Sequence, residues 1–379
     1  MTWARRVTYG VAVCGSLISA SAAFSAAQPA PEAAPVRPAM TQASAALQTP
    51  SRPYRFAKTF DVHTFRRGNI HTHTSRSDGD SPPRTVYSWY RDHGYDFVIV
   101  TDHNRFTNPD EYRSVETPGF IVIGGEEITM RGAGREVHVN ALCTHHRLPG
   151  GKFGTAAAAL AHGVGETRRA GAIALVNHPN FTWGVQFGDL SAASSANLIE
   201  IESGHPSVHT EGNDSHPSHE NLWDESLTAG QDFMGVAVDD AHNFKGTGKA
   251  GPGRAWVEVF AEQLDESSIC SGLETGMLYS STGASLDRIA VTEDTYTVWP
   301  QDPEVEVTFI GSSGRELEHA SRYPGEPAVA YHLVGGEGYV RARIVTPEGK
   351  LAFTPPVRVA AANALPVADV AAPPPGPHG

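Results

Sequence analysis

Short apolar runs alternate with amphipathic stretches through the middle of the chain. Some runs are continuous, as in Phe97–Val100, which is typical of a strand buried on both faces. Helices are predicted at Pro82–His93, Thr155–Arg169 and Ser218–Thr228, each followed within two residues by a glycine. The alternation predicts a parallel α/β architecture over residues 52–290, either a barrel or a wide sheet. The seven predicted strands are Gly68–His73, Asp96–Asp102, Gly119–Glu127, Glu136–Cys143, Ala172–Asn177, Leu198–Glu202 and Phe233–Asp239.

From about residue 295 the pattern changes to a regular alternation of apolar and polar residues. Val305–Phe309, Val329–His332 and Tyr339–Val345 alternate in this way, and turn signals such as Gly311–Gly314 separate them. We therefore predict a small antiparallel β module over residues 291–360 that packs on the α/β unit. The module carries no chemical motif.

The beginning of the chain has the pattern of an export signal. Arg5 and Arg6 precede an apolar stretch, Val7–Ala26, that is rich in small residues and contains no acid. This composition favours a cleaved signal peptide over residues 1–26 rather than a retained membrane anchor. Residues 27–51 and 361–379 have few large apolar side chains, so we predict that both are disordered. We expect a periplasmic or secreted protein with no stable membrane span after cleavage.

Charge and cysteine content narrow the functional classes. The net charge of −13 argues against sequence-independent nucleic-acid binding, because such binding depends on many Lys and Arg contacts with phosphates. Apolar residues make up 40% and charged residues 19%, which excludes a wholly disordered chain. Signal cleavage would leave Cys143 and Cys270. They could pair in an oxidising compartment, but a buried free thiol is at least as well supported, because Cys143 lies in an apolar run.

Polar residues cluster at the carboxyl ends of the predicted strands. His71 and His73 are two residues apart in a strand and therefore share a face, as do Asp240 and His242. Imidazole and carboxylate groups without thiolates suit Zn, Mn, Fe or Co. Buried charges and imidazoles are costly without partners, and a metal cluster would satisfy them together.

These motifs, taken in order, resemble the polymerase-and-histidinol-phosphatase (PHP) superfamily. The resemblance extends over about residues 67–285, and its details are most similar to the carbamate-hydrolase-like CehA/McbA branch. Features of that branch are Gly125–Thr129, Glu274–Tyr279 and the closing Tyr339-Val-Arg341 segment. The superfamily motifs are His71-Thr-His73, Ser-Asp78-Gly, Asp-His103, Gly-Glu-Glu127, His138, His178-Pro and Asp240-Ala-His242.

The resemblance implies a distorted (β/α)7 barrel with two or three transition-metal ions, Mn, Fe or Zn, at its C-terminal mouth. It selects Glu127 rather than Glu126 as a ligand, because Ile128 follows it. Glu126 is then a neighbouring polar group. All the customary ligand positions are filled, which argues against a non-catalytic copy. The implied metal ligands are His71, His73, Asp78, His103, Glu127, His138, His178, Asp240 and His242.

Other residues near these motifs are weaker candidates. Asp102 and Glu202 could orient ligands, and His205 lies in a loop, residues 203–218, that could cover the site and supply a general acid. Surface exposure is the default for cationic residues. Three of them nevertheless adjoin ligand segments and could hold an anionic group of a substrate: Lys245, Arg254 and Arg105.

The leading hypothesis is an exported, metal-dependent phosphoesterase that attacks a small-molecule ester with a metal-bound hydroxide. The alternative is a hydrolase of carbamate or carboxylic esters with the same ligands. A cationic clamp near the metals would favour phosphate, and an apolar cleft would favour an aryl carbamate. A non-catalytic metal-binding module is disfavoured by the complete ligand set, and a polymerase accessory by the export signal. The sequence specifies no oligomeric state.

Overall fold

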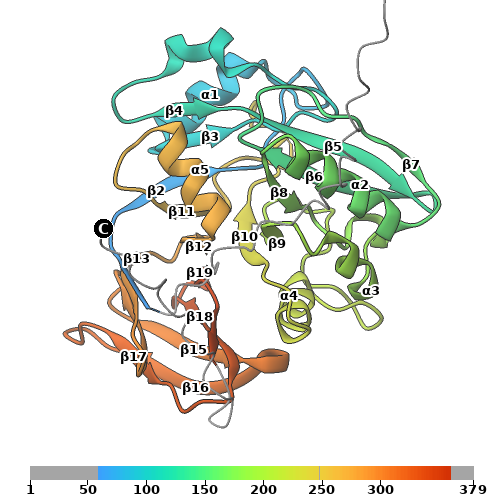
Figure 1. The fold of residues 1–379 in the computed structure, drawn as a ribbon. Coiled ribbons are helices and arrows are strands. Elements are labelled where there is room, and N and C mark those ends of the chain that lie inside the picture. Colours follow the sequence, from blue (N-terminus) through green and yellow to red (C-terminus); the bar gives the residue numbers. More distant parts are fainter. Residues whose placement is uncertain (1–58, 247, 360–379) are drawn as a thin grey trace, which may run out of the picture. The chain divides into compact units, whose positions relative to one another are not determined.

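The computed structural model describes residues 59–246 and 248–359 (Figure 1). The predicted signal peptide, linker and C-terminal tail lie outside the described residues. Within them, no helix is long and apolar enough to cross a membrane.

Two sheets surround the predicted metal ligands. The smaller has the strand order β10 (Met234–Val238), β9 (Leu198–Ser203), β8 (Ile173–Val176), β6 (Arg135–Leu142), β5 (Gly125–Gly132) and β7 (Gly151–Phe153). The larger has the order β16 (Arg315–Arg322), β15 (Val305–Gly311), β18 (Gly338–Val345), β19 (Leu351–Phe353), β12 (Leu278–Ser281), β11 (Trp256–Phe260), β2 (Phe65–Asn69), β3 (Phe97–Ile99) and β4 (Ile121–Ile123), and β20 (Val357–Val359) also pairs with β18.

The predicted closed (β/α)7 barrel needs a correction, because the described residues form no closed sheet. Among the described residues, the backbones of the two sheets pair only through isolated bridges, and both bridges lie at the ligand motifs: Thr72 pairs with Ala241, and His103 pairs with Glu127. The predicted strand Gly119–Glu127 is divided into β4 and β5 at Gly124, where a Cβ would lie 2.3 Å from the Thr144 carbonyl oxygen. The result is a mixed α/β fold in which two sheet edges meet at the site.

The prediction of a purely parallel sheet is also wrong. Strands β2, β3 and β4 are parallel, as are β8, β9 and β10, but β6 runs antiparallel to both β5 and β8. A two-residue turn connects β5 to β6, and both of its residues, Ala133 and Gly134, have positive φ. Such a hairpin turn leaves no room for the crossover helix that a parallel connection requires.

Helices cover the outer faces of both sheets (Figure 1). The three predicted helices are found as α1 (Pro83–Asp92), α2 (Ala156–Arg169) and α4 (His219–Thr228). Thr155 caps α2 by accepting a hydrogen bond from the Ala158 amide at 3.1 Å. The remaining helices are α3 (Phe187–Leu190), α5 (Glu266–Thr275) and the short 3-10 segments Pro109–Val115, Phe181–Trp183, Ser191–Ala193 and Ser312–Gly314.

The C-terminal part of the chain is an antiparallel β unit with its own apolar core, which includes Phe309, Val340 and Ile344. It contains a separate sheet of β1 (Phe60–Val62), β13 (Leu286–Val291), β14 (Thr295–Pro300) and β17 (Val329–His332). The larger sheet continues from this unit to the metal-ligand strands, because β19 pairs with β12. The unit is therefore continuous with the rest of the fold in its backbone hydrogen bonding.

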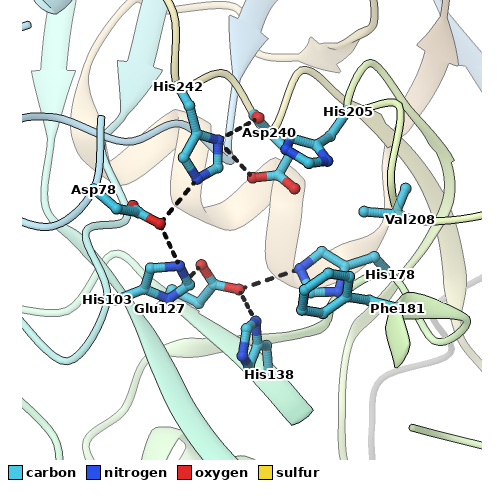
Figure 2. A pocket seen from close by; sticks show the side chains of 10 residues that line it. All are labelled: Asp78, His103, Glu127, His138, His178, Phe181, His205, Val208, Asp240 and His242. Atoms are coloured by element: carbon cyan, nitrogen blue, oxygen red, sulfur yellow. Dashed lines mark hydrogen bonds and ion pairs between the residues drawn. The ribbon is translucent and has the colours of Figure 1, made fainter. Parts of the chain in front are cut away.

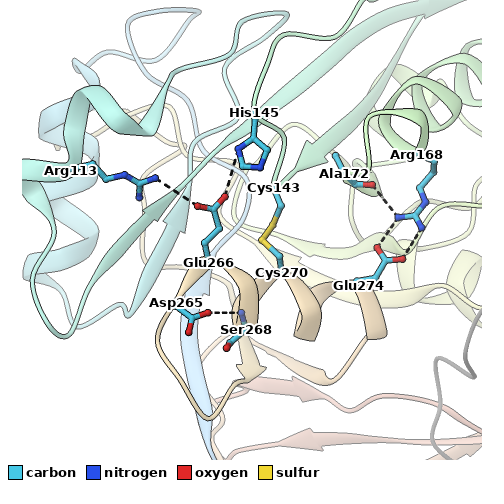
Figure 3. Close-up of a disulfide and its surroundings, with 10 residues drawn as sticks. All are labelled: Arg113, Cys143, His145, Arg168, Ala172, Asp265, Glu266, Ser268, Cys270 and Glu274. Carbon is cyan, nitrogen blue, oxygen red and sulfur yellow. Dashed lines mark hydrogen bonds and ion pairs between the residues drawn. A yellow bond between two sulfur atoms is a disulfide. The ribbon is translucent and has the colours of Figure 1, made fainter.

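Cys143 and Cys270 form a disulfide that joins the segment after β6 to helix α5 (Figure 3). This pairing resolves the choice that the sequence left open and excludes the free thiol at Cys143. Cys143 has a φ of 58°, so it has left the β6 backbone conformation, and it is partly buried against the apolar core.

Candidate metal centre

The candidate site is built from the ends of neighbouring strands. His71 and His73 follow β2, His103 follows β3, Glu127 and His138 lie within β5 and β6, and Asp240 and His242 follow β10. The two isolated bridges bring these ends into register. As a result all nine predicted ligands fall into four overlapping groups, each of which has its ligand atoms within 4.8 Å of one another.

At the centre of these overlapping groups lie four atoms, from His71, His73, Glu127 and Asp240, which we call the innermost group; the two imidazole nitrogens lie 3.2–3.3 Å from each other and from both carboxylate oxygens. His73 Nε2 lies 3.2 Å from His71 Nε2, from Glu127 Oε2 and from Asp240 Oδ1. His71 Nε2 lies 3.2 Å from Glu127 Oε2 and 3.3 Å from Asp240 Oδ1. All four side chains are at least 95% buried.

Two further groups flank this centre (Figure 2). Glu127 Oε1 lies 2.8 Å from His138 Nδ1 and 3.3 Å from His178 Nε2, so the two oxygens of one carboxylate serve different groups. Asp78 Oδ2 lies 3.5 Å from His103 Nε2 and 3.4 Å from His242 Nε2.

The geometry fits metal ligation better than hydrogen bonding. Both ring nitrogens of His138 and Asp240 Oδ1 are buried and make no hydrogen bond, although other polar atoms lie close to them. Ligand atoms that share a tetrahedral ion at about 2.0–2.2 Å lie about 3.3–3.6 Å apart, which is close to the spacing in the innermost group. The nitrogen and oxygen donors suit a borderline transition metal, and they supply ligands for more than one ion.

The pKa shifts of these side chains agree with metal ligation. Burial opposes protonation of His138, but the carboxylates of Glu127 and Glu136 outweigh it and raise the His138 pKa to about 9. Burial also raises the Asp240 pKa, yet His71 and the other nearby histidines bring it well below its usual value. The protonated imidazoles thus place positive charge beside the carboxylates. Bound metal cations would supply that positive charge instead.

Two residues that position ligands were missed by the sequence analysis. Glu200 is fully buried, accepts a hydrogen bond from His71 Nδ1 at 2.6 Å and also accepts the amide of His178. The first contact leaves His71 Nε2 free to face the cluster. Asn177 donates to Glu127 Oε1 at 2.8 Å and so fixes that carboxylate. A glutamate inside the apolar strand Leu198–Ser203 was the available signal for Glu200.

Asp102 and Glu202, which the sequence suggested could orient metal ligands, lie in different places. Asp102 is buried and accepts hydrogen bonds from Thr74, Ser77 and Thr107, so it organises the loop that carries Asp78. Glu202 contacts none of the nine ligands; it lines a separate pocket beside the C-terminal β unit. Burial raises the Glu202 pKa to about 7.

The metal-ligand residues line a pocket of about 200 Å³. Its other walls are Phe181, Val208 and His205, and the latter two belong to the loop 203–218 (Figure 2). His205 Nδ1 accepts a hydrogen bond from the Ser207 amide, so a neutral ring carries its proton on Nε2. Burial lowers the His205 pKa, which keeps the ring neutral.

The three cationic candidates lie outside this pocket. Arg254 is exposed and donates to the Gly204 carbonyl oxygen, which ties down the start of the loop. Lys245 is exposed beside Asp80, whose carboxylate accepts the Lys245 amide. Arg105 lines a separate groove. No Lys or Arg is among the described residues that line the metal pocket.

No protein-family model matches this chain, and no curated protein matches it. Among solved structures, a two-domain protein from Bacteroides vulgatus, described as containing a predicted PHP-like metal-dependent phosphoesterase, is 15% identical, with 80% of this chain and 96% of that chain covered and a TM-score of 0.43. A putative metal-dependent phosphoesterase from Bifidobacterium adolescentis is 16% identical, with 55% and 96% covered and a TM-score of 0.37. An amidohydrolase from Chromobacterium violaceum is 14% identical, with 47% and 88% covered and a TM-score of 0.32. At these scores the likeness assigns no activity and no residue roles to this chain.

Proposed function

We propose that this chain is a metal-dependent hydrolase of the PHP superfamily that cleaves an ester bond of a small molecule, with phosphate esters as the leading substrate class. The observation that supports it most strongly is the clustering of nine imidazoles and carboxylates, seven of which line one pocket, with the two Glu127 oxygens serving different groups. His71, His73, Glu127 and Asp240 would hold one ion. His138 and His178 with Glu127, and Asp78 with His103 and His242, would hold the others.

The chain's own residues would then position the substrate and stabilise charge on the departing oxygen. Bound divalent cations would supply Lewis acidity and lower the pKa of water to about 7. His205 lines the same pocket, and its neutral ring can donate a hydrogen bond from Nε2 to the departing oxygen. Phe181 and Val208 form an apolar wall that excludes water from one side of the pocket.

A carbamate or carboxylic ester remains the second candidate substrate, and one observation favours it. The described lining of the metal pocket offers Phe181 and Val208 but no guanidinium or ammonium group to neutralise a phosphoryl oxygen. A neutral ester needs no such group. This agrees with the sequence resemblance to the carbamate-hydrolase-like CehA/McbA branch, which we propose as the subgroup.

The Cys143–Cys270 disulfide supports the proposal that the protein is exported. Stable disulfides form in oxidising compartments such as the periplasm and the extracellular space. The basic and apolar start of the sequence, residues 1–26, agrees with that location.

The test combines elemental analysis with matched substrates. We expect purified protein to hold two or three equivalents of Mn, Fe or Zn and to hydrolyse p-nitrophenyl phosphate mono- or diesters. His71→Ala should lose metal and activity together. His332→Ala, an exposed position on β17, is the control and should change neither. Turnover of the aryl carbamate or acetate alone would establish the second candidate. Active protein with less than one bound ion would refute the metal-dependent mechanism.

A further inference from the structure

A second concave surface lies beside the metal pocket and has a different chemical character. It is an open groove of about 670 Å³, lined by Asn104, Arg105, Phe106, His145, His146 and Arg147. We call it the basic groove. Of the described residues that line it, none is acidic, whereas the metal pocket is lined by three carboxylates. On a chain of net charge −13, counted with His neutral, two arginines and no acid in one groove make a local reversal of sign.

The basic groove and the metal pocket are adjacent along the chain. His103 lines the metal pocket, and the next residue, Asn104, lines the groove. Asn104 has a φ of 49°, a left-handed conformation that Asn tolerates, and this turn directs His103 and Arg105 to different surfaces. The Asn104 side chain is fixed because it accepts from the Thr129 amide and donates to the Thr129 carbonyl oxygen.

The turn that carries the other cations is held at both ends. Cys143 anchors its start to α5 through the disulfide (Figure 3). The Leu148 amide anchors its end by donating to Glu126 Oε2 at 2.8 Å, and Arg147 Nε donates to the Asn104 carbonyl oxygen at 2.7 Å. Within the turn, Thr144 Oγ1 donates to the His146 carbonyl oxygen at 3.0 Å. The cations are therefore displayed on a fixed backbone rather than on a loose loop.

The guanidinium groups of the groove keep free donors. Arg105 is exposed, and its side chain makes no hydrogen bond or ion pair with any residue that the structure describes. Arg147 donates one hydrogen bond within the protein, from Nε. Its two terminal nitrogens have no hydrogen-bond acceptor among the described residues. His145 approaches one acid, Glu266, at 4.0 Å, and that carboxylate is shared with Arg113. Planar guanidinium donors match the paired oxygens of carboxylate, phosphate and sulfate groups.

We propose that the basic groove binds an anionic group in the part of the substrate that is not cleaved. The substrate would be an ester with a second acidic group, placed so that the scissile bond enters the metal pocket while the acidic arm extends past His103 to Arg105 and Arg147. Phe106 provides an apolar surface for the connecting atoms. The inference rests on the proposed function only in taking the metal pocket as the place of cleavage.

The kinetic test uses two esters that differ only in the distal arm. A p-nitrophenyl ester with a sulfonate-terminated propyl arm is compared with the same ester ending in a hydroxyl, on whichever ester class the metal-loaded, full-length mature protein hydrolyses. We expect kcat/KM to favour the sulfonate arm, mainly through KM, and the preference to shrink as ionic strength rises. Arg105→Gln should reduce this ratio roughly 10- to 100-fold. Arg147→Lys, which keeps a charge, should reduce it less.

Arg169→Gln is the matched control, because Arg169 is an exposed arginine on α2 that pairs with Glu166 and lies outside both pockets. It should leave the ratio unchanged.

Binding of benzenedisulfonate, measured by calorimetry on the same proteins, gives a readout that needs no turnover. We expect binding to wild type and weaker binding to Arg105→Gln. Equal kcat/KM for both arms in wild type, or a ratio that Arg105→Gln leaves intact, would overturn the proposal even if the enzyme is an active hydrolase. Anion binding without any turnover would support the groove and refute the proposed reaction.

Discussion

Glu200 and Glu202 show how sharply the surroundings of a carboxylate change along one strand. Both lie in β9, two residues apart, which in a regular strand would place them on the same face. The β9–β10 register is irregular here: Val236 pairs with Glu200, and the next residue, Ala237, pairs with Glu202. Glu200 therefore reaches His71, while Glu202 lies in a pocket beside the C-terminal β unit.

The pair provides a matched test of ligand positioning. We expect Glu200→Gln to weaken metal binding about 10- to 100-fold, because its single amide oxygen cannot accept from both His71 Nδ1 and the His178 amide as the two carboxylate oxygens do. Glu202→Gln is the control and should keep wild-type metal content. The measurement is metal retained after dialysis against a graded chelator series. Equal retention in the two variants would show that Glu200 does not position the ligand.

A third carboxylate gives a prediction about pH. Glu258 on β11 is only 14% exposed; burial raises its pKa to about 7, although Trp256 Nε1 donates to it at 2.9 Å. The folded state therefore binds this proton more tightly than the unfolded state, whose pKa is near 4.5. Stability from this group is complete below about pH 4.5 and is lost as pH rises toward 7.

Glu258→Gln removes this loss, so the variant should be more stable than wild type by roughly 1–3 kcal/mol at about pH 8, with little difference at about pH 4. Chemical unfolding at the two pH values measures the effect. Glu316→Gln, at an exposed position on β16, should show no such difference. A Glu258→Gln benefit that is the same at both pH values would point to packing rather than to proton binding.

Part of the candidate ligand set could be predicted from local spacing in the sequence, and the complete set of nine rested on the resemblance to the PHP superfamily. His71 and His73 share a strand face, and Asp240 and His242 repeat that spacing. Glu200 could not be assigned in the same way, because its role depends on a register irregularity with β10 that no local pattern encodes. The positions of Arg105, Lys245 and Arg254 outside the metal pocket depend equally on tertiary structure.

At the scale of elements, strands and helices were found close to their predicted positions, but their connections were not predicted. The predicted strand Gly68–His73 lies earlier, as β2 (Phe65–Asn69), so His71 and His73 follow the strand instead of lying in it. Strand β6 was predicted from its apolar run, yet its antiparallel direction depends on the two-residue turn at Ala133 and Gly134. The break at Gly124 divides one predicted strand into β4 and β5. Each feature determines which strand ends meet. Apolar periodicity reports burial, and it does not report the direction in which a strand pairs.

The disulfide is the element-scale feature with the clearest energetic consequence. It closes a loop of 127 residues between Cys143 and Cys270, and such a constraint stabilises a fold mainly by restricting the unfolded chain. We expect Cys270→Ser to lower the free energy of unfolding by about 2–4 kcal/mol. Denaturant unfolding with and without reductant measures it. Reductant should destabilise wild type and leave Cys270→Ser unchanged; a wild type indifferent to reductant would mean that the bond does not contribute.

At the scale of the whole molecule, hydrogen bonds and ion pairs join the C-terminal β unit to α4, the helix that follows loop 203–218. Arg341 on β18 is fully buried, donates from Nε and Nη2 to the two oxygens of Asp224 at 2.8 and 2.7 Å, and reaches Glu220 at 2.7 Å. Both acids lie on α4, which begins directly after loop 203–218. Tyr339 donates to the same Asp224 carboxylate at 2.7 Å. The β unit thereby fixes one end of the loop that carries His205.

This arrangement predicts that the β unit and the metal site unfold together. Arg341→Ala would leave Asp224 buried without its partner, which typically costs about 3–5 kcal/mol. Arg288→Ala removes an arginine at the surface that pairs with Asp61 and should have little effect on stability. Replacing Arg341 and Asp224 together by Met and Leu should recover much of the loss, because no charge then remains unpaired at that position.

Unfolding is followed by intrinsic fluorescence and by metal release to a chromogenic chelator. If Arg341→Ala lowers the fluorescence transition while metal release keeps its wild-type midpoint, the β unit folds independently and does not support the loop; coincident shifts would show that the two parts are one cooperative structure.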